Sequence, residues 1–224
     1  MEGLCENRLR LRACLYEMLA LCLHAEPSQD TLGRLLDQWP YLEHLLTYWS
    51  EPTVGEGVRL FLGVAEKSDA ADLAVDYARL FLGAATGSIC PSESSYRDGR
   101  LFGEHTTEVR QFYARCGFAT DDSFTEPDDH IAVECYFMAI LAGSSLAVWQ
   151  DRNYGISPFQ DHIRHQLVFL KEHLSQWIET WAADVQNLSV SEFFKAVADL
   201  AVVVVKKDLD FLQALTQAEG FSVR

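Results

Sequence analysis

Positive charge is scarce in this chain of 224 residues: 18 lysines and arginines stand against 33 aspartates and glutamates, and the formal net charge is −15. A surface with this balance repels phosphate groups. The composition therefore argues against nucleic acid and against an anionic membrane as partners, and it permits a basic ligand. Ordinary solubility explains the same acidic surplus, so charge alone selects no function.

Cysteine pairs are also lacking, since the six cysteines form no Cys-x-x-Cys motif. We expect reduced thiols, as is usual in cytosolic proteins. Cys90 and Cys116 lie in irregular surroundings and are candidates for reactivity, although no base is evident for either. Arginine and glutamate interrupt the apolar positions of the first 24 residues, and no apolar run approaches the ~18 residues of a membrane span. We expect a cytoplasmic protein without stable membrane insertion.

Alternating strand patterns, internal repeats and phosphate-binding motifs are missing as well. The glycine-containing segment 83–96 lacks the Gly-Lys-Ser/Thr ending of a phosphate loop, and no strand precedes it. Apolar residues instead recur with helical spacing along most of the chain. The sequence predicts an all-α fold of about ten helices, packed as a single helical globule in two halves. We assign residues 1–118 to the first half, 119–130 to a hinge and 131–224 to the second half.

Helix boundaries follow from capping residues, prolines and glycines. Ser28 is expected to cap the second helix, which Pro40 should end, and Gly83 is expected to end the helix that begins near Asp69. Segment 83–96 should be a loop, and the β-branched residues 201–205 should continue a helix. The predicted helices span residues 4–24, 28–39, 56–66, 69–82, 104–116, about 126–150, 159–185 and 191–218.

The stretch from Thr125 to Met138 joins a turn, three acids, a proline and a histidine to an apolar helical run. Thr125 and Asp128 have the spacing of a capping box, and Pro127 suits a first helical turn. Beyond them, apolar residues recur at helical spacing. Those expected to face the core are Ile131, Cys135, Met138 and Ala142.

Glu126, His130 and Glu134 follow one another at intervals of four, so a helix that reaches back to Glu126 places them on one stripe. A neighbouring carboxylate is then expected to raise the pKa of His130. Three interpretations are open: a capped helix whose histidine bonds an acid, a metal site, and a recognition site at the lip of a groove. The spacing matches neither the zinc-protease motif nor the di-iron motif.

The same residues carry a family resemblance. Glu126-Pro127-Asp128-Asp129-His130 resembles the Glu-Pro-x-Asp-His motif of the TorD/DmsD family, the cytoplasmic chaperones for maturation of molybdenum-containing oxidoreductases. Further segments are similar to that family: Tyr77-x-Arg79-Leu80-Phe81-x-Gly83, then Pro91 and Glu93-Ser94-x-Tyr96, and finally Phe169, His173, Leu174 and Trp177 in a Phe-x3-His-Leu-x2-Trp pattern.

The resemblance implies a chaperone and not an enzyme, with no cofactor of its own. The expected partner is the catalytic subunit of a molybdopterin-containing oxidoreductase, whose twin-arginine leader or apo form is held until cofactor insertion and folding are finished. The chain is expected to be a monomer or a domain-swapped dimer. By resemblance, the peptide-binding groove is built by Tyr77, Leu80, Phe81, Pro91, Glu93, Ser94, Tyr96, Glu126, Asp129 and His130.

Within that groove we expect aromatic and apolar side chains to supply affinity, and Glu93, Glu126 and Asp129 to select arginine. Two alternatives stay open. A helical adaptor would bind the folded body of a cytoplasmic molybdoenzyme without reading a leader, as related nitrate-reductase chaperones are expected to do. A metal enzyme or hydrolase would use His130 with a neighbouring acid, although no nucleophile with its base is evident.

Overall fold

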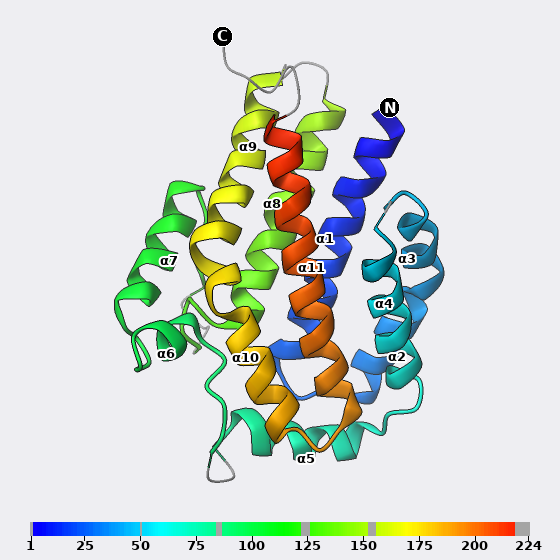
Figure 1. Ribbon diagram of the computed structural model, residues 1–224, viewed down its shortest axis with the longest axis vertical. Coiled ribbons are helices and arrows are strands. Elements are labelled where there is room, and N and C mark those ends of the chain that lie inside the picture. Colours follow the sequence, from blue (N-terminus) through cyan, green and yellow to red (C-terminus); the bar gives the residue numbers. More distant parts are fainter. Residues whose placement is uncertain (1, 50, 84–86, 122–125, 152–155, 218–224) are drawn as a thin grey trace.

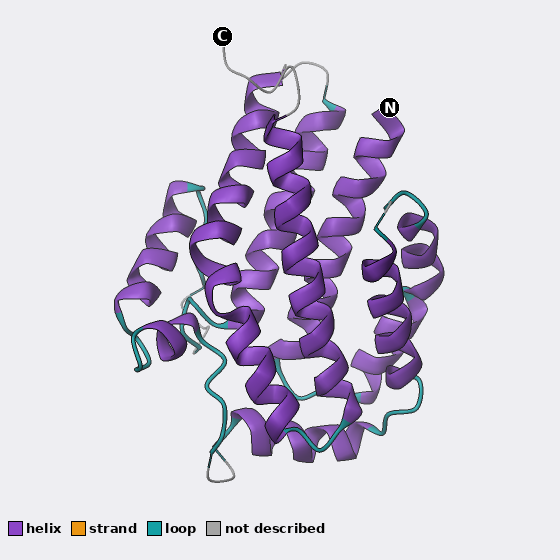
Figure 2. Cartoon of the chain, in the orientation of Figure 1, coloured by secondary structure: helices purple, strands orange, loops and turns teal. Residues whose placement is uncertain are grey.

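Helices make up all the regular elements that the structure describes (Figure 1 and Figure 2). The computed structural model describes residues 2–49, 51–83, 87–121, 126–151 and 156–217. Within these ranges the β-type pairing is limited to an isolated antiparallel bridge between Ser92 and His130. The predicted all-α fold is confirmed.

Eleven α-helices and one π-helical turn follow one another in the described ranges. They are α1 (Glu2–His24), α2 (Gln29–Asp37), α3 (Trp39–Leu46), α4 (Pro52–Ala65), α5 (Ala70–Phe81), α6 (Glu93–Arg97), α7 (Glu104–Arg115), α8 (Ile131–Gln150), α9 (Ile156–Phe169), the π turn η1 (Leu170–Leu174), α10 (Ser175–Leu188) and α11 (Glu192–Gln217).

Several boundaries differ from the sequence prediction, three of them in the first half of the chain. Pro40 lies in the first turn of α3 and does not end a longer second helix, because a first turn needs no N–H group from proline. Pro52 starts α4 in the same way, so that helix takes in Gly55 and begins earlier than predicted. Glu93–Arg97 forms the short helix α6 inside the segment predicted to be a loop.

Two predicted helix signals are confirmed. Ser28 caps α2, its side-chain oxygen accepting the backbone N–H of Thr31. Gly83 follows α5 with a φ of +71°, a left-handed conformation that glycine adopts without strain. The single helix predicted over residues 159–185 is found as α9, η1 and α10 in unbroken succession.

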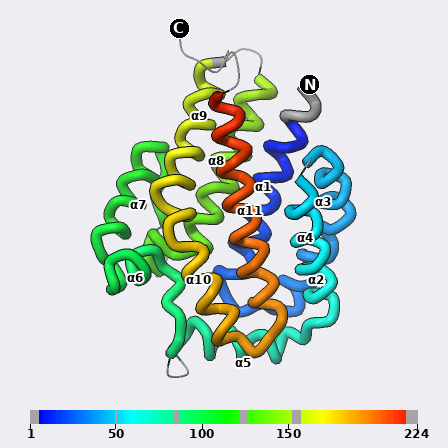
Figure 3. The backbone as a smooth tube through the Cα atoms, viewed as in Figure 1, coloured from blue at the N-terminus to red at the C-terminus, as the bar shows by residue number. Residues whose placement is uncertain are grey.

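Four long helices, α1, α8, α9 and α11, run along the long axis of the molecule (Figure 1 and Figure 3). The interface of α1 with α8 is the most extensive among the described helices, and α11 packs against both α4 and α10. Helix α5 crosses one end of this bundle, while α6 and α7 lie on one side and α2 to α4 on the other. Helices from the two ends of the chain therefore share one core. The division into residues 1–118, 119–130 and 131–224 stays a prediction.

A buried ion pair ties α1 to α11 inside this core. The guanidinium of Arg12 donates to the carboxylate of Asp208, and the hydroxyl of Tyr16 donates to the same carboxylate over 3.0 Å. Nη2 of Arg12 also donates to Gln166 of α9 over 2.6 Å, and Gln166 donates to Ser145 of α8 over 2.6 Å. The four long helices thus meet in one hydrogen-bonded network, which favours a single register of packing.

Helix α8 is long and apolar enough, by length and composition alone, to cross a membrane, and it is the one such helix in the described part of the chain. The expectation that no apolar run approaches that length is therefore wrong for this segment. A core helix of a globular protein has the same composition. Here 56% of the most apolar window is buried inside the protein, so α8 is a core helix with one side left partly uncovered.

Candidate functional site

His130 is the N-cap of α8. Its Nδ1 atom accepts the backbone N–H of Ala132 over 3.2 Å, and the helix begins at Ile131. The predicted capping box is therefore wrong in its boundary, because Asp128 lies before the helix and not in its first turn. Thr125, the other member of that box, lies outside the described residues. The histidine ring takes the place that a threonine hydroxyl was expected to fill.

The expected stripe of Glu126, His130 and Glu134 does not form, since Glu126 is exposed and precedes the helix, whereas Glu134 is fully buried. The expected direction of the histidine pKa is also wrong. Burial, which is the larger cause, and the nearby charge of His24 together lower the pKa of His130 from 6.5 to about 4. His130 is therefore a neutral ring at physiological pH, and a neutral Nδ1 is what accepting an N–H requires.

The segments Pro91–Ser94 and Asp129–Ile131 are held together by hydrogen bonds, and we call this pair of segments the latch. The N–H of Glu93 donates to the carbonyl of Asp129 over 3.0 Å, and the N–H of Ile131 donates to the carbonyl of Pro91 over 2.8 Å. Oδ2 of Asp129 accepts the N–H of Ser94 over 2.6 Å. That carboxylate satisfies an N–H of the first turn of α6, which explains a helix in a segment predicted to be a loop.

Glu93 connects the latch to the segment between α9 and α10. Its side chain is fully buried, its Oε1 accepts from Arg97, and its Oε2 lies 3.0 Å from Nδ1 of His173. Nη1 of Arg97 also donates to the carbonyl of Glu172 over 2.8 Å. His173 lies in the π turn η1, the one departure from α-helical geometry between α9 and α10 in the described chain. Such turns are frequent at functional sites.

Glu134 lies one turn inside α8, near Glu93 and Asp129 of the latch. Burial raises the pKa of its carboxyl well above the usual value, and the charges of Glu93 and Asp129 raise it further. Nε1 of Trp177 donates to Glu134 Oε2 over 3.4 Å. The raised pKa favours the protonated form of Glu134, which limits the negative charge where three buried acids share one region.

Tyr96 packs against Trp177, the residue that donates to Glu134. Its ring is stacked on Trp177, with centroids 5.5 Å apart, and its hydroxyl donates to Asp184 over 2.9 Å. Burial and the hydrogen bond to Asp184 raise the pKa of the tyrosine. The motif residues before α7 are thus fastened to α10 as well as to α8.

Asp128 fastens the same region to α7. Its Oδ2 accepts from Nε of Arg110 over 2.7 Å, and its Oδ1 accepts from the hydroxyl of Thr120 over 2.5 Å. The hydroxyl of Tyr113 donates to the carbonyl of Asp128 over 3.0 Å. Every acid from Asp128 to Glu134 is therefore engaged with the protein itself.

Several polar atoms of the latch nevertheless have no hydrogen-bond partner within the described ranges. They are Oδ1 of Asp129 and the hydroxyls of Ser92 and Ser94. Buried polar atoms are nearly always paired, and exceptions gather at sites of strain or function. The latch therefore differs from ordinary core packing.

The ten residues predicted to bind peptide divide by exposure. Glu126 is exposed, while Phe81 and Tyr96 are partly exposed. The remaining residues are buried: Tyr77, Leu80, Pro91, Glu93, Ser94, Asp129 and His130. The structure brings Pro91, Glu93, Ser94, Asp129 and His130 together in the latch. Their contact with a peptide stays a prediction.

Tyr77 and Phe81 form a second aromatic group. Their rings lie 5.1 Å apart, and both rings meet Phe194 of α11. The hydroxyl of Tyr77 lies 3.5 Å from the carbonyl of Leu23 at the end of α1. Leu80 lies in the last turn of α5, and its carbonyl accepts the N–H of Ile89, two residues before the latch, over 2.6 Å.

An open cavity of about 610 Å³ lies beside the latch, and we call it the α1–α8 cavity. It is bounded by α1, by α8, by the end of α7 and residues 118–121, and by Arg34 of α2. Its apolar wall consists of Ala20, Leu21, Tyr113, Phe118, Ala119, Ala132, Val133, Tyr136, Phe137 and Ile140, and its polar members are Glu17, His24, Arg34, Thr120 and Asp121. Volumes of about 300–1,000 Å³ are usual for ligand sites.

None of the residues that line this cavity is among the ten predicted to bind peptide, although the sequence of α8 contains a signal for such a surface. The apolar positions of α8 continue around the helix, so that Val133, Tyr136 and Ile140 form a second stripe beside the buried one. A helix that is apolar all round needs partners on every side. Tyr136 is 55% exposed, so the second stripe is incompletely covered.

The metal alternative gains no support from the site. Among the residues that the structure describes, no three histidine, cysteine or acidic side chains are grouped as metal ligands would be. Burial raises the pKa of Cys116, which opposes formation of a reactive thiolate. The polar groups near His130 are arranged to hold segments together.

A comparison with known protein families identifies the family of this chain. Residues 50–183, more than half of the chain, match the family described as "Nitrate reductase delta subunit". The chain therefore belongs to that family. The resemblance to TorD-like maturation chaperones, drawn from the motifs, is confirmed by curated relatives as well.

Two of those relatives cover nearly the whole chain. "Chaperone protein TorD" of Shewanella piezotolerans is 27% identical over 218 residues, which is 90% of this chain and 92% of the relative. The protein of the same name from Aliivibrio fischeri is 27% identical over 210 residues, with 90% and 94% covered. The chain is a redox-enzyme maturation chaperone and not an enzyme, and chaperones of the TorD family work with a redox-enzyme partner.

A solved structure also aligns with the chain. It is described as a putative redox enzyme maturation protein from Archaeoglobus fulgidus, is 19% identical, and aligns over 90% of this chain and 93% of its own with a TM-score of 0.47.

Proposed function

We propose that this chaperone acts in the cytoplasm, where it binds the twin-arginine leader of a molybdopterin-containing oxidoreductase subunit and holds the apo form while cofactor is inserted. The observation that carries the proposal is the open apolar cavity of about 610 Å³ on a strongly acidic protein. A leader is a basic segment followed by an apolar one. The cavity and the acidic surface offer both kinds of contact.

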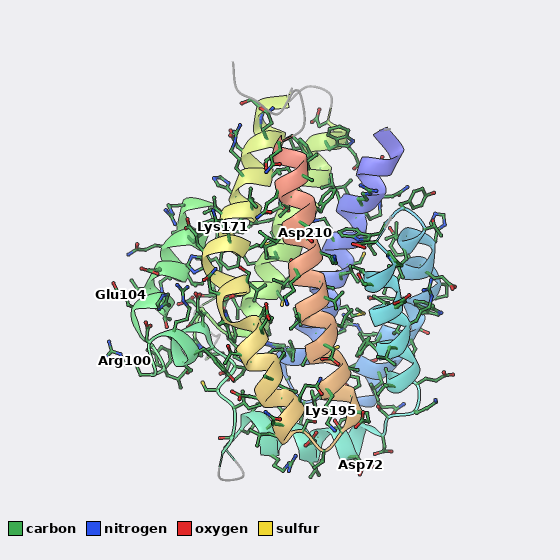
Figure 4. All side chains as sticks on the ribbon, in the orientation of Figure 1. Asp72, Arg100, Glu104, Lys171, Lys195 and Asp210 are labelled. Carbon is green, nitrogen blue, oxygen red and sulfur yellow. The ribbon has the colours of Figure 1, made fainter. Side chains whose placement is uncertain are left out.

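The two kinds of contact contribute unequally to affinity. Charged side chains such as Asp72 and Glu104 project from the outer faces of the bundle into solvent (Figure 4). An exposed ion pair contributes only about 0.2–1 kcal/mol, so two arginines alone would bind weakly. Burying ~300 Å² of apolar peptide surface contributes about 7–8 kcal/mol before the peptide is ordered, and ordering it costs about 2–5 kcal/mol. The apolar segment therefore supplies most of the affinity, and the arginines supply selection.

Calorimetric titration tests the proposal directly. The titrant is a synthetic twin-arginine leader from a molybdopterin oxidoreductase encoded beside the chaperone, and a twin-lysine version is the matched control. We expect saturable binding with a Kd of about 1 μM, about −8 kcal/mol, and weaker binding of the lysine peptide. Equal binding of both peptides, or binding of neither, contradicts a leader-reading role.

A second candidate function is binding of the folded body of the redox enzyme. One observation favours it: Leu101 and Phe102 are neighbours in the turn before α7, and they are 45% and 63% exposed. Phe102 has a φ of +54°, a conformation that a bulky residue rarely adopts. Two adjacent exposed apolar side chains on a fixed turn suit contact with a folded surface.

The leaderless apo-enzyme separates the two candidates. If it binds the wild-type chaperone as tightly as the form with leader, and Phe102→Ser weakens that binding, the main contact is with the enzyme body. If removing the leader abolishes binding and Phe102→Ser has no effect, the leader is the main contact.

A further inference from the structure

A groove of about 560 Å³ lies near the end of the bundle that α5 crosses, and we call it the α4–α5 groove (Figure 1). Helix α4 and the turn after it form one wall, and the starts of α5 and α11 form the other. Its large apolar members are Leu60, Val64, Leu73 and Phe193. Leu73 and Phe193 are buried, whereas Leu60 is 62% exposed. The groove therefore has an apolar floor and an uncovered apolar side chain on the α4 wall.

Two more apolar side chains extend this surface. Val75 and Val190 are 71% and 69% exposed, the highest values among the large apolar residues of the described ranges. Both adjoin Asp76, because Val75 precedes it on α5 and the N–H of Val190 donates to its carboxylate over 3.4 Å. Asp72 and Ser191, their near neighbours in the sequence, both line the α4–α5 groove. The two valines therefore continue the surface of the groove.

The backbone that carries Val190 is anchored by a buried carboxylate. Oδ2 of Asp76 accepts the hydroxyl of Ser189 over 2.7 Å and the N–H of Ser191 over 3.0 Å. Asp76 is buried, and the two serines stand on either side of Val190 in the sequence. The most exposed apolar side chain of this loop is thus held by a fixed backbone, which lowers the entropy cost of binding a partner there.

The two walls of the groove carry opposite charges. Arg59 and Lys67 lie on the α4 wall, and neither has an ion pair within the described ranges. On the other wall, Asp69 accepts N–H groups at the start of α5, and Glu192 is paired with a lysine of its own helix. Asp72 is the acid of that wall whose carboxylate has no such bond within the part of the chain described. A ligand of one charge sign alone would be repelled by one of the walls.

A second copy of this chain has charges that fit both walls. In a dimer with two-fold symmetry the same surface of each copy meets the other, so the basic wall of one copy can face the acidic wall of its partner at two equivalent places. Two copies that each carry a net charge of −15 repel one another overall. A contact that brings opposite charges together locally offsets this repulsion. The exposed side chains of Leu60, Val75 and Val190 supply apolar area for the same contact.

We propose that two copies of the chain dimerise through the α4–α5 groove, with Leu60 of each copy entering the groove of the other. Asp72 of each copy then faces Arg59 and Lys67 of the other. No helix is exchanged between the copies, so this dimer differs from a domain-swapped one. The groove and the α1–α8 cavity share no lining residue. The contact therefore leaves the residues of that cavity to the ligand of each copy.

Sedimentation equilibrium of the full chain tests the apolar part of the contact. The mass of the wild type should rise from that of one chain toward that of two between about 1 and about 100 μM. Leu60→Asp places a charge against the apolar floor of the facing groove, and we expect dimerisation weaker by about tenfold or more. The control is Val168→Asp, at an exposed position of α9 that is not among the lining residues of either cavity. It should dimerise as the wild type does.

Charge reversal tests the pairing of the walls. One variant carries Arg59→Glu together with Lys67→Glu, and a second variant carries Asp72→Lys; all three positions are exposed, so the fold should tolerate the changes. Each variant should dimerise poorly by itself, because like charges then face one another across the interface. An equimolar mixture of the two variants should regain the dimer, because both contacts of the mixed pair join opposite charges. Circular dichroism of each variant checks that its fold is unchanged.

Three results would overturn the proposal. One is a wild type that stays monomeric up to about 100 μM. Another is a dimer that persists undiminished in Leu60→Asp, since the contact would then lie elsewhere or depend on exchanged helices. The third is a mixture of the charge variants that is no more associated than its components. None of these results bears on leader binding, which calorimetric titration measures separately.

Discussion

Nδ1 of His173 lies 3.0 Å from Oε2 of Glu93, across 80 residues of sequence. Both side chains are buried, and Glu93 begins α6 while His173 lies in the π turn before α10. The pair therefore joins the two motif-bearing parts of the chain. It also gives the π turn a physical role, because that turn carries the histidine that meets Glu93.

His173→Ala should destabilise the protein by about 1–3 kcal/mol, because it leaves a buried carboxylate with fewer partners. Urea unfolding followed by circular dichroism measures the change. His44→Ala, at an exposed position of α3, is the control and should stay within about 0.5 kcal/mol of the wild type. If both variants lose the same stability, the pair with Glu93 contributes nothing specific.

Acidification should weaken the fold through His130. Its pKa is 6.5 unfolded and about 4 folded, so below pH 6.5 the unfolded chain binds a proton that the native chain does not. Stability is then lost as the pH falls from about 6.5 to about 4, by up to about 3 kcal/mol. His130→Asn keeps a side chain that caps helices well and removes this titration. Unfolding curves at several pH values should converge for variant and wild type as the pH falls.

His44→Asn, at an exposed position, is the control for that experiment and should leave the wild-type pH dependence unchanged. Parallel curves for wild type and His130→Asn would show that burial of His130 does not depress its pKa.

Glu134 should have the opposite effect on the pH dependence. Its pKa is raised above the ordinary 4.5 by burial and by Glu93 and Asp129, so the native state holds a proton that the unfolded chain releases. Stability is therefore lost as the pH rises above 4.5, by about 1.4 kcal/mol per pH unit until the native carboxyl ionises. Glu134→Gln removes this loss, so the stability of the variant relative to the wild type should increase as the pH rises above 4.5. A difference between the two proteins that stays constant above pH 4.5 would show that the native pKa of Glu134 is not raised.

Asp208→Ala should cost about 3–5 kcal/mol, because it leaves the guanidinium of Arg12 buried without its carboxylate. Replacing both residues, with Arg12→Met and Asp208→Leu, should restore much of the lost stability, since an apolar pair of similar volume avoids the buried charge. Thermal unfolding of the single and double variants measures the coupling. A double variant no more stable than Asp208→Ala would show that the network cannot be replaced by apolar packing.

Gly103→Ala should destabilise the turn before α7, because a Cβ there would clash with the carboxylate of Asp98. That carboxylate accepts the N–H of His105 over 3.0 Å, so moving it away loses the bond. We expect a loss of about 1–3 kcal/mol, as for other overpacked sites. Gly33→Ala in α2 is the matched control, because its Cβ would meet nothing within 4 Å. It should be neutral or stabilising by up to about 1 kcal/mol.

Local features of the sequence determined most of the helices, although not α6, whose first turn is capped by the distant Asp129. Ser28 and Gly83 mark helix ends because a hydroxyl and a left-handed glycine satisfy end groups wherever they occur. Ile131, Cys135 and Met138 are buried as predicted, because helical spacing alone puts them on one face. The motif residues also sufficed to indicate the family, since a motif is read without knowing what its side chains touch.

Only the tertiary structure decided what those side chains do. The pKa of His130 falls instead of rising because the ring is buried and lies near His24, and both conditions depend on how distant segments pack. Glu93 meets His173 only because α6 lies against α10. The α1–α8 cavity likewise depends on the relative positions of α1, α7 and α8. In the sequence Tyr136 is one of several apolar positions of α8, and only the packing of the helices leaves its side chain exposed. The periodicity of the sequence determines which face of a helix is apolar, but distant segments determine whether other residues cover that face.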